Sequence, residues 1–137
     1  DTDLSATESC VLERFSAAAL IERHVSHPVG PVSKRSFVLL TMRLDTSPHN
    51  LRILNASVHY PGEKGGHLPS ATPGTYLPTL MLFDRCDDGS WEVTTFGHVS
   101  LGGWLPSSVV LTGLPPIIIA NVKKFIKFTV ENCKANE

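Results

Sequence analysis

The chain has 137 residues, of which 42% are hydrophobic and 18% are charged, an ordinary balance for one globular domain. Its 12 basic and 13 acidic residues give a formal net charge of −1, which argues against a nucleic-acid-binding protein with a strongly basic surface. No apolar run approaches the ~20 residues that span a bilayer, and the acidic start of the chain lacks the basic-then-apolar plan of a signal peptide.

The cysteine pattern favours a reducing compartment. Cys10, Cys86 and Cys133 are odd in number and far apart, so they do not form a disulfide framework, and no C-x-x-C motif occurs. We therefore expect an intracellular protein that resides in the cytoplasm.

The first half of the chain predicts β-strands. Residues 10–15 and 20–26 are short segments of mixed apolar and polar character, and the proline-containing stretch 27–34 predicts a loop. Residues 35–44 form a clear strand, with Phe37, Leu39, Thr41 and Arg43 on one face and Val38, Leu40, Met42 and Leu44 on the other. Because both faces are apolar, we expect this strand to be covered on both sides.

The strand pattern continues to residue 101. Residues 51–60 predict the second strand of an antiparallel hairpin, and the glycine-rich stretch 61–66 predicts an exposed loop. A further strand is expected at 75–83, where Pro78 indicates an edge position or a bulge. Residues 91–101 alternate well and predict the last strand.

The C-terminal part predicts helices. Residues 108–113 suit a short helix that ends at Gly113, and Pro115-Pro116 suits the first turn of a longer helix over 116–133. That helix has an apolar stripe on one side and lysines on the other. Strands followed by one long helix predict an α+β fold.

The link between the two parts, GHVSLGGWLP (97–106), can bend sharply at Gly102 and Gly103, with Trp104 expected as a large buried anchor. This stretch resembles the corner of START lipid-transfer domains (steroidogenic acute regulatory protein-related), where a last strand runs into Gly-Trp-Leu-Pro and a closing helix. The stretch VGPVSKRSFVLL also resembles the family's Pro-Arg-Asp-Phe segment, with Ser36 in place of the usual acid. Residues 74–106 are similar to the family's run of strand, turn, strand and corner.

The resemblance implies a helix-grip fold, a curved antiparallel β-sheet with a long C-terminal α-helix packed over it. It implies one START-like lipid-binding domain over residues 1–137, with the family's N-terminal helix and first strands expected before Asp1. The edge left open by those strands would allow self-association.

The resemblance also implies a function. START domains enclose one lipid, such as a sterol or phospholipid, in an apolar tunnel between sheet and helix, for transfer or sensing. We therefore expect a lipid ligand, transient membrane contact, and neither catalysis, cofactor, metal nor nucleic acid. The residues expected to contact the ligand are Phe37, Leu39, Thr41, Val93, Thr95, His98, Val109, Val110, Gly113, Leu114 and Ile117. Which face of each strand looks inward stays open, because both faces carry apolar residues.

Two alternative functions remain. An enzyme of the same fold, such as a polyketide cyclase or aromatase, would need converging acid, base or arginine groups, for which Arg43, His59, His98 and Asp84 are the candidates. An interaction module with a collapsed cavity is the other. His24-x-x-His27 is a weak metal motif, since no cysteine or carboxylate set completes it.

Overall fold

The structure is a computed structural model that describes residues 8–26, 28, 32–47, 49–112, 115, 116, 119 and 123. Residues Glu8–Gly103 form one compact unit, and the described residues from Trp104 onward belong to a second. Each unit is described by itself below. No helix among the described residues is long and apolar enough to cross a membrane.

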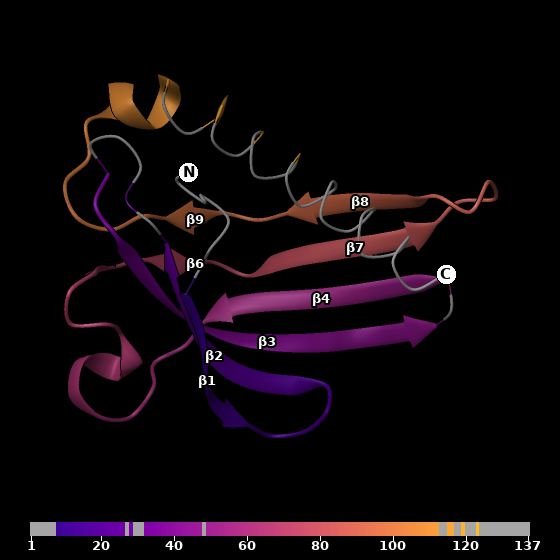
Figure 1. Cartoon of the computed structure of the whole chain (residues 1–137), viewed down its shortest axis with the longest axis horizontal. Helices are drawn as coiled ribbons and strands as arrows, with labels where there is room; N and C mark the ends of the chain where they lie inside the picture. The colour runs from indigo at the N-terminus through magenta and orange to yellow at the C-terminus, as the bar shows by residue number, and fades with distance from the viewer. Residues whose placement is uncertain are drawn as a thin grey trace. The chain divides into compact units, whose positions relative to one another are not determined.

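One antiparallel sheet dominates the first unit (Figure 1). Its strands follow the path β1-β2-β3-β4-β7-β8, so each strand pairs with its neighbour along the chain apart from the excursion between β4 and β7. The bounds are β1 (Glu8–Arg14), β2 (Ala19–Ser26), β3 (Arg35–Ser47), β4 (Asn50–Ser57), β7 (Thr79–Arg85) and β8 (Trp91–Phe96). The excursion contains the 3-10 helix η1 (Glu63–Gly66), β5 (Thr72–Pro73) and β6 (Thr75–Tyr76).

The predicted strands are confirmed, with two interruptions. The strand expected at 75–83 breaks at Leu77 and Pro78, so that β6 leaves the main sheet and pairs with β9 (Val99–Ser100). The strand expected at 91–101 breaks at Gly97 and His98, where the Leu77 amide donates to the carbonyl of His98 at 3.0 Å. Proline lacks the ladder donor, which explains the first break.

The strand register defines two faces of the sheet. The Phe37 face carries the odd-numbered residues 37, 39 and 41 of β3 and the residues opposite them, and the Val38 face carries residues 36, 38 and 40 with their partners. Two rows extend the Phe37 face to β8, namely Arg43–Ile53–Met81–Thr95 and Leu51–Phe83–Val93.

The Val38 face is covered at β2 and β3 by the segment 58–71. The Leu68 amide donates to Ser36 Oγ at 3.0 Å, and Arg23 Nη1 donates to the carbonyl of Gly66 at 3.3 Å. Ser36 and Val38 are fully buried, and Val25, opposite Ser36, is 3% exposed. The serine at the position of the family's usual acid thus anchors a loop with its hydroxyl.

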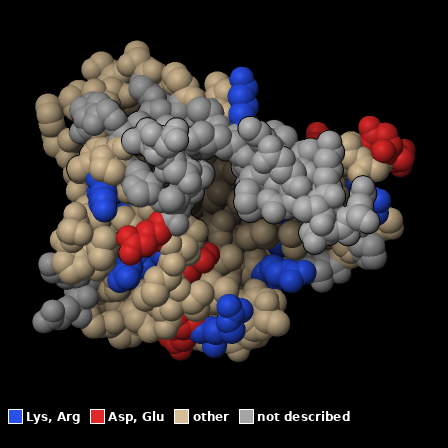
Figure 2. Space-filling model, in the orientation of Figure 1, with Lys and Arg blue, Asp and Glu red and all other residues tan. Residues whose placement is uncertain are grey.

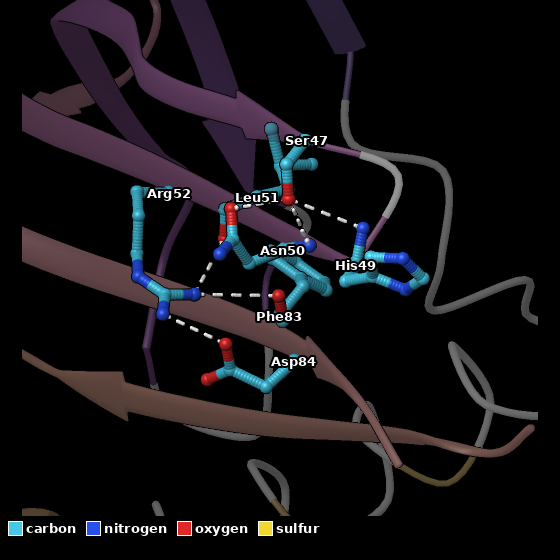
Figure 3. Close-up of polar contacts among 7 residues, drawn as sticks. All are labelled: Ser47, His49, Asn50, Leu51, Arg52, Phe83 and Asp84. Carbon is cyan, nitrogen blue, oxygen red and sulfur yellow. Dashed lines mark hydrogen bonds and ion pairs between the residues drawn. The ribbon is translucent and has the colours of Figure 1, made fainter. Parts of the chain in front are cut away.

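The β3–β4 hairpin is fastened to β7 at one end of the sheet (Figure 3). Ser47 Oγ accepts the amide of His49 at 3.2 Å and that of Asn50 at 3.1 Å, a side-chain turn that closes the hairpin. Arg52 Nη2 donates to Asp84 Oδ1 at 2.7 Å and its Nη1 to the carbonyl of Phe83 at 3.3 Å. Because both charged groups are partly exposed, this pair contributes at most ~1 kcal/mol.

Charges of both signs are mixed on the visible surface. Figure 2 shows Lys and Arg interspersed with Asp and Glu on this face, with no large area of one sign. This agrees with the near-zero net charge of the chain.

The corner that leads out of the sheet is tightly packed. Arg35, 4% exposed, donates from Nε to the carbonyl of Leu101 at 2.7 Å and from Nη1 to Ser33 Oγ at 2.6 Å. Gly102 (φ 62°) and Gly103 (φ 68°) adopt left-handed backbone conformations. A Cβ on Gly102 would overlap the carbonyl oxygen of Pro73, so glycine is required there.

Among the residues from Trp104 onward, those at 107–112 are helical, one residue earlier than the helix predicted from 108, and so are residues 115, 116, 119 and 123. The predicted end at Gly113 and most of the helix expected over 116–133 lie outside the described residues. The expectation that Trp104 is a buried anchor is wrong, because its side chain is 87% exposed. The corner is held by the Arg35 hydrogen bonds and the glycines instead.

Replacing Gly102 with alanine should destabilise the protein by about 2–4 kcal/mol. The left-handed backbone costs a non-glycine residue ~1–2 kcal/mol, and the overlap with Pro73 adds a similar amount. Gly89→Ala is the matched control, since φ is 82° there and nothing lies within 4 Å of a Cβ. Urea unfolding of both variants measures the difference, and equal losses would show that the contact with Pro73 is relieved without cost.

Trp104→Ala should change the free energy of unfolding by no more than ~0.5 kcal/mol, because the side chain is 87% exposed. Thermal unfolding of the full chain checks this. A loss of ~3–5 kcal/mol, typical of a buried tryptophan, would show that the indole is buried in solution.

Candidate functional site

A polar cluster lies in the middle of the Phe37 face. Thr41 Oγ1 donates to Glu22 Oε1 at 2.6 Å and lies 2.9 Å from Asn55 Oδ1. The three side chains come from neighbouring strands β2, β3 and β4, and the register places Asn55 directly opposite Thr41. A hydroxyl has one proton, so Thr41 donates to one of its two neighbours at a time.

Two further side chains reach the other carboxylate oxygen. His24 Nε2 lies 3.1 Å from Glu22 Oε2, and Ser9 Oγ donates to the same oxygen at 3.4 Å. The distance from His24 is that of an ion pair, but its nitrogen is buried without an aligned hydrogen bond. We name Ser9, Glu22, His24, Thr41 and Asn55 the Glu22 cluster.

The Glu22 cluster keeps its carboxylate ionised. Burial alone would raise the pKa of Glu22, but the hydrogen bond from Thr41, the electrostatic attraction of the nearby His24 and the hydrogen bond from Ser9 together lower it. With its side chain 18% exposed, Glu22 is an anion on a largely apolar surface. Such a group favours a partner that donates hydrogen bonds.

Large apolar side chains surround the cluster on the side of the β2–β3 loop. Phe37 is 5% exposed and Leu39 is 4% exposed. The ring of Tyr76 meets that of Phe37 edge to face, with centroids 4.9 Å apart, and burial raises the pKa of Tyr76. A Cβ on Gly74 would overlap the Phe37 ring, so glycine lets the chain pass close to it.

The register places five of the expected ligand-contacting residues on this one face. Thr41 belongs to the Glu22 cluster and Phe37 and Leu39 adjoin it, whereas Val93, 45% exposed, and Thr95 lie on β8, several strands away. Their contact with a ligand stays a prediction. At β2 and β3 the segment 58–71 covers the Val38 face. Which face contacts a ligand stays a prediction.

The other expected contacts are not joined to the cluster by any described interaction. His98 is exposed on the link between β8 and β9. Val109 and Val110 are helical residues of the second unit. Gly113, Leu114 and Ile117 lie outside the described residues.

The groups that an enzyme of this fold would need do not converge within the part of the chain that the structure describes. Asp84 pairs with Arg52 on the Val38 face, and His59 is exposed in the excursion after β4. Among the described residues, no group of three or more His, Cys, Asp and Glu side chains could hold a metal ion. The Glu22 cluster supplies hydrogen-bond acceptors and donors.

Four of the five residues of the Glu22 cluster were not expected from the sequence to contact a ligand, namely Ser9, Glu22, His24 and Asn55. Glu22 and His24 are two residues apart in a short strand and so share a face, which is the available signal. Recognising that this face is also the face of Thr41 requires the β2–β3 register, in which Glu22 lies opposite Leu39.

Several solved structures share this fold. Human StAR-related lipid transfer protein 5 superposes with a TM-score of 0.76 at 19% identity, over 93% of this chain and 64% of that one. The lipid transfer and protein localization domain of human StarD13 (DLC2) superposes with a TM-score of 0.68 at 21% identity, over 84% of this chain and 57% of that one. Human STARD10 superposes with a TM-score of 0.73 at 20% identity, over 90% of this chain and 50% of that one. The chain thus spans about half to two-thirds of the length of these structures.

The sequence itself matches a known family. No curated protein sequence matches the chain. The sequence model of the START domain matches residues 1–135, nearly the whole chain, and agrees with the predicted α+β helix-grip fold and with the solved structures. The chain belongs to the START domain family.

Proposed function

We propose that this chain binds one hydrophobic ligand, a sterol, phospholipid or other lipid, on the Phe37 face, for lipid transfer or sensing. The observation that carries the proposal is the Glu22 cluster, an ionised carboxylate with its hydrogen-bond partners on an apolar sheet face. A lipid has a matching distribution of groups, with one polar end on a large apolar body.

The energetics of such a site are simple. Burial of the apolar body contributes ~25 cal/mol per Å² removed from water and has no preferred direction. A few polar groups then fix the orientation. Because Glu22 is anionic, the polar end that it favours carries a hydrogen-bond donor, such as the hydroxyl of a sterol or the amide and hydroxyl of a ceramide.

The comparisons support a lipid ligand. The chain belongs to the START family, and two of the solved structures of this fold carry lipid transfer in their names. Since the chain spans only part of those proteins, transfer between membranes is proposed here by analogy.

The second wall of the proposed tunnel is the C-terminal helix. An apolar ligand on a sheet face needs a cover, and Val109 and Val110, with the predicted residues Gly113, Leu114 and Ile117, are the candidates. We propose that these residues close over the lipid, in a single START-like domain.

We also propose transient contact with membranes in a reducing, cytoplasmic setting. Lys123 is an exposed helical residue, and Lys124 and Lys127 follow it in the sequence. Cys10 and Cys86 are exposed free thiols, which suits a reducing compartment.

The proposed function is tested by incubating the chain with mixed-lipid vesicles, repurifying it and recording its native mass spectrum. We expect one lipid per chain. An absence of bound lipid would favour the interaction module with a collapsed cavity, whereas turnover of a polycyclic aromatic substrate would favour the cyclase or aromatase alternative.

Glu22→Gln should weaken the binding of cholesterol about tenfold or more, because a hydrogen bond to a charged group contributes ~1.5–3 kcal/mol. Glu92→Gln is the matched control, since Glu92 is an exposed acid on the Val38 face of β8. Titration with a fluorescent sterol measures both variants. Equal affinities would remove Glu22 from the ligand site.

Membrane contact through lysines predicts that lipid transfer to anionic vesicles slows as salt rises, because ions screen charges beyond ~8–10 Å. Lys123→Gln should slow transfer to anionic vesicles and leave transfer to neutral vesicles unchanged. Transfer of a fluorescent sterol checks both, and rates independent of salt would contradict a role of the lysines.

A further inference from the structure

The positions of the hydrogen atoms in the Glu22 cluster follow from its distances and charges. Thr41 Oγ1 lies 2.6 Å from Glu22 Oε1 and 2.9 Å from Asn55 Oδ1, so one hydroxyl faces two oxygen atoms. Burial raises the pKa of Glu22, but its hydrogen bonds and the nearby His24 lower it by more, so this carboxylate carries no proton. The single proton of Thr41 therefore lies in the shorter contact, toward Glu22.

The amide of Asn55 then has to present its nitrogen to Thr41. If Asn55 Oδ1 faced Thr41, two oxygen atoms would lie in contact with no hydrogen between them, which is unfavourable. The two ends of an amide have nearly the same shape, so the hydrogen-bond pattern decides which end meets which neighbour. With Nδ2 toward Thr41, the hydrogen bonds run in one direction, from Asn55 to Thr41 and from Thr41 to Glu22.

This arrangement leaves Glu22 Oε2 as a strong acceptor with weak partners. Ser9 Oγ donates to it across 3.4 Å, a long distance for a hydroxyl donor. His24 Nε2 lies 3.1 Å from it but forms no aligned hydrogen bond. A carboxylate oxygen can accept two hydrogen bonds, so Glu22 Oε2 can receive a donor from a ligand.

Asn55 Oδ1 is a second acceptor beside the first. Turning Nδ2 toward Thr41 points Oδ1 away from Thr41, on the Phe37 face. Thr79, the residue opposite Asn55 on β7, does not donate to it, because its hydroxyl donates to the carbonyl of Leu77 at 3.0 Å. Among the described residues, no side chain apart from Thr41 hydrogen-bonds to Asn55. Because the side chains of Glu22 and Asn55 meet at one hydroxyl, the two acceptors lie close together.

We propose that the polar end of the ligand carries two hydrogen-bond donors on neighbouring carbon atoms, one for Glu22 Oε2 and one for Asn55 Oδ1. The 1,2-diol of a monoacylglycerol or glycerol ether has this pattern, and so do the amide and hydroxyl of a ceramide. A sterol with a single hydroxyl leaves one acceptor buried without a partner. The proposal rests on the proposed lipid site and adds the donor pattern by which that site distinguishes lipids.

Displacement of a fluorescent sterol from the full chain by two pairs of lipids tests the donor pattern. The first pair is 1-O-hexadecylglycerol and its 3-deoxy analogue, and the second is a ceramide and the ester analogue in which oxygen replaces the amide nitrogen. We expect the lipid with two neighbouring donors to bind about tenfold more tightly than its analogue, and the pair that shows this identifies the source of the pattern. Equal affinities within both pairs would overturn the proposal and leave the lipid site intact. No binding of any lipid, the sterol included, would contradict the proposed function itself.

Variants of Thr41 test the role of its hydroxyl through the ratio of two affinities, which a purely structural defect would leave unchanged. Thr41→Val keeps the shape of the side chain but lets the Asn55 amide turn either end to the ligand, so the preference for the two-donor lipid should fall from about tenfold to about twofold. Thr41→Ser keeps the hydroxyl and should keep the preference. A Thr41→Val variant that retains the full preference would overturn the proposal. If that variant does not fold, the two lipid pairs on the unmodified chain still decide.

Discussion

Burial of β3 on both faces is the constraint on which the rest of the unit is built. Phe37 and Val38 are adjacent and point to opposite sides, yet they are 5% and 0% exposed. A single sheet cannot bury both, so each side needs its own cover. On the Val38 side the cover is the segment 58–71, held by hydrogen bonds to Ser36 and Arg23. The polar cluster therefore sits on the one face that this segment leaves free.

The Glu22 cluster follows from strand alternation rather than from any local motif. β2, β3 and β4 contribute Glu22, Thr41 and Asn55, and strand alternation places all three side chains on the Phe37 face. An isolated carboxylate there would be destabilising, because burial disfavours its charge. The hydrogen bonds from Thr41 and Ser9 and the nearby His24 offset that cost and lower the pKa of Glu22. These partners rigidify the cluster before any ligand is present, which is how a site gains orientation at little entropic cost.

The fold could be predicted from the sequence where a long segment shows a regular apolar pattern. Prediction failed where the structure depends on contacts between residues that are distant in the sequence. The alternation in β3 and the resemblance at Gly103-Trp104-Leu105-Pro106 pointed to the sheet and the family. The two-residue strands β5, β6 and β9 are too short to show an alternation of apolar and polar residues. The sequence therefore predicted neither these strands nor the breaks at Pro78 and Gly97. Trp104 was expected to be buried because of its size, whereas hydrogen bonds from the Arg35 guanidinium to the carbonyl of Leu101 and to Ser33 hold the corner. Glu22 and Thr41 are 19 positions apart in the sequence, and only the register joins them.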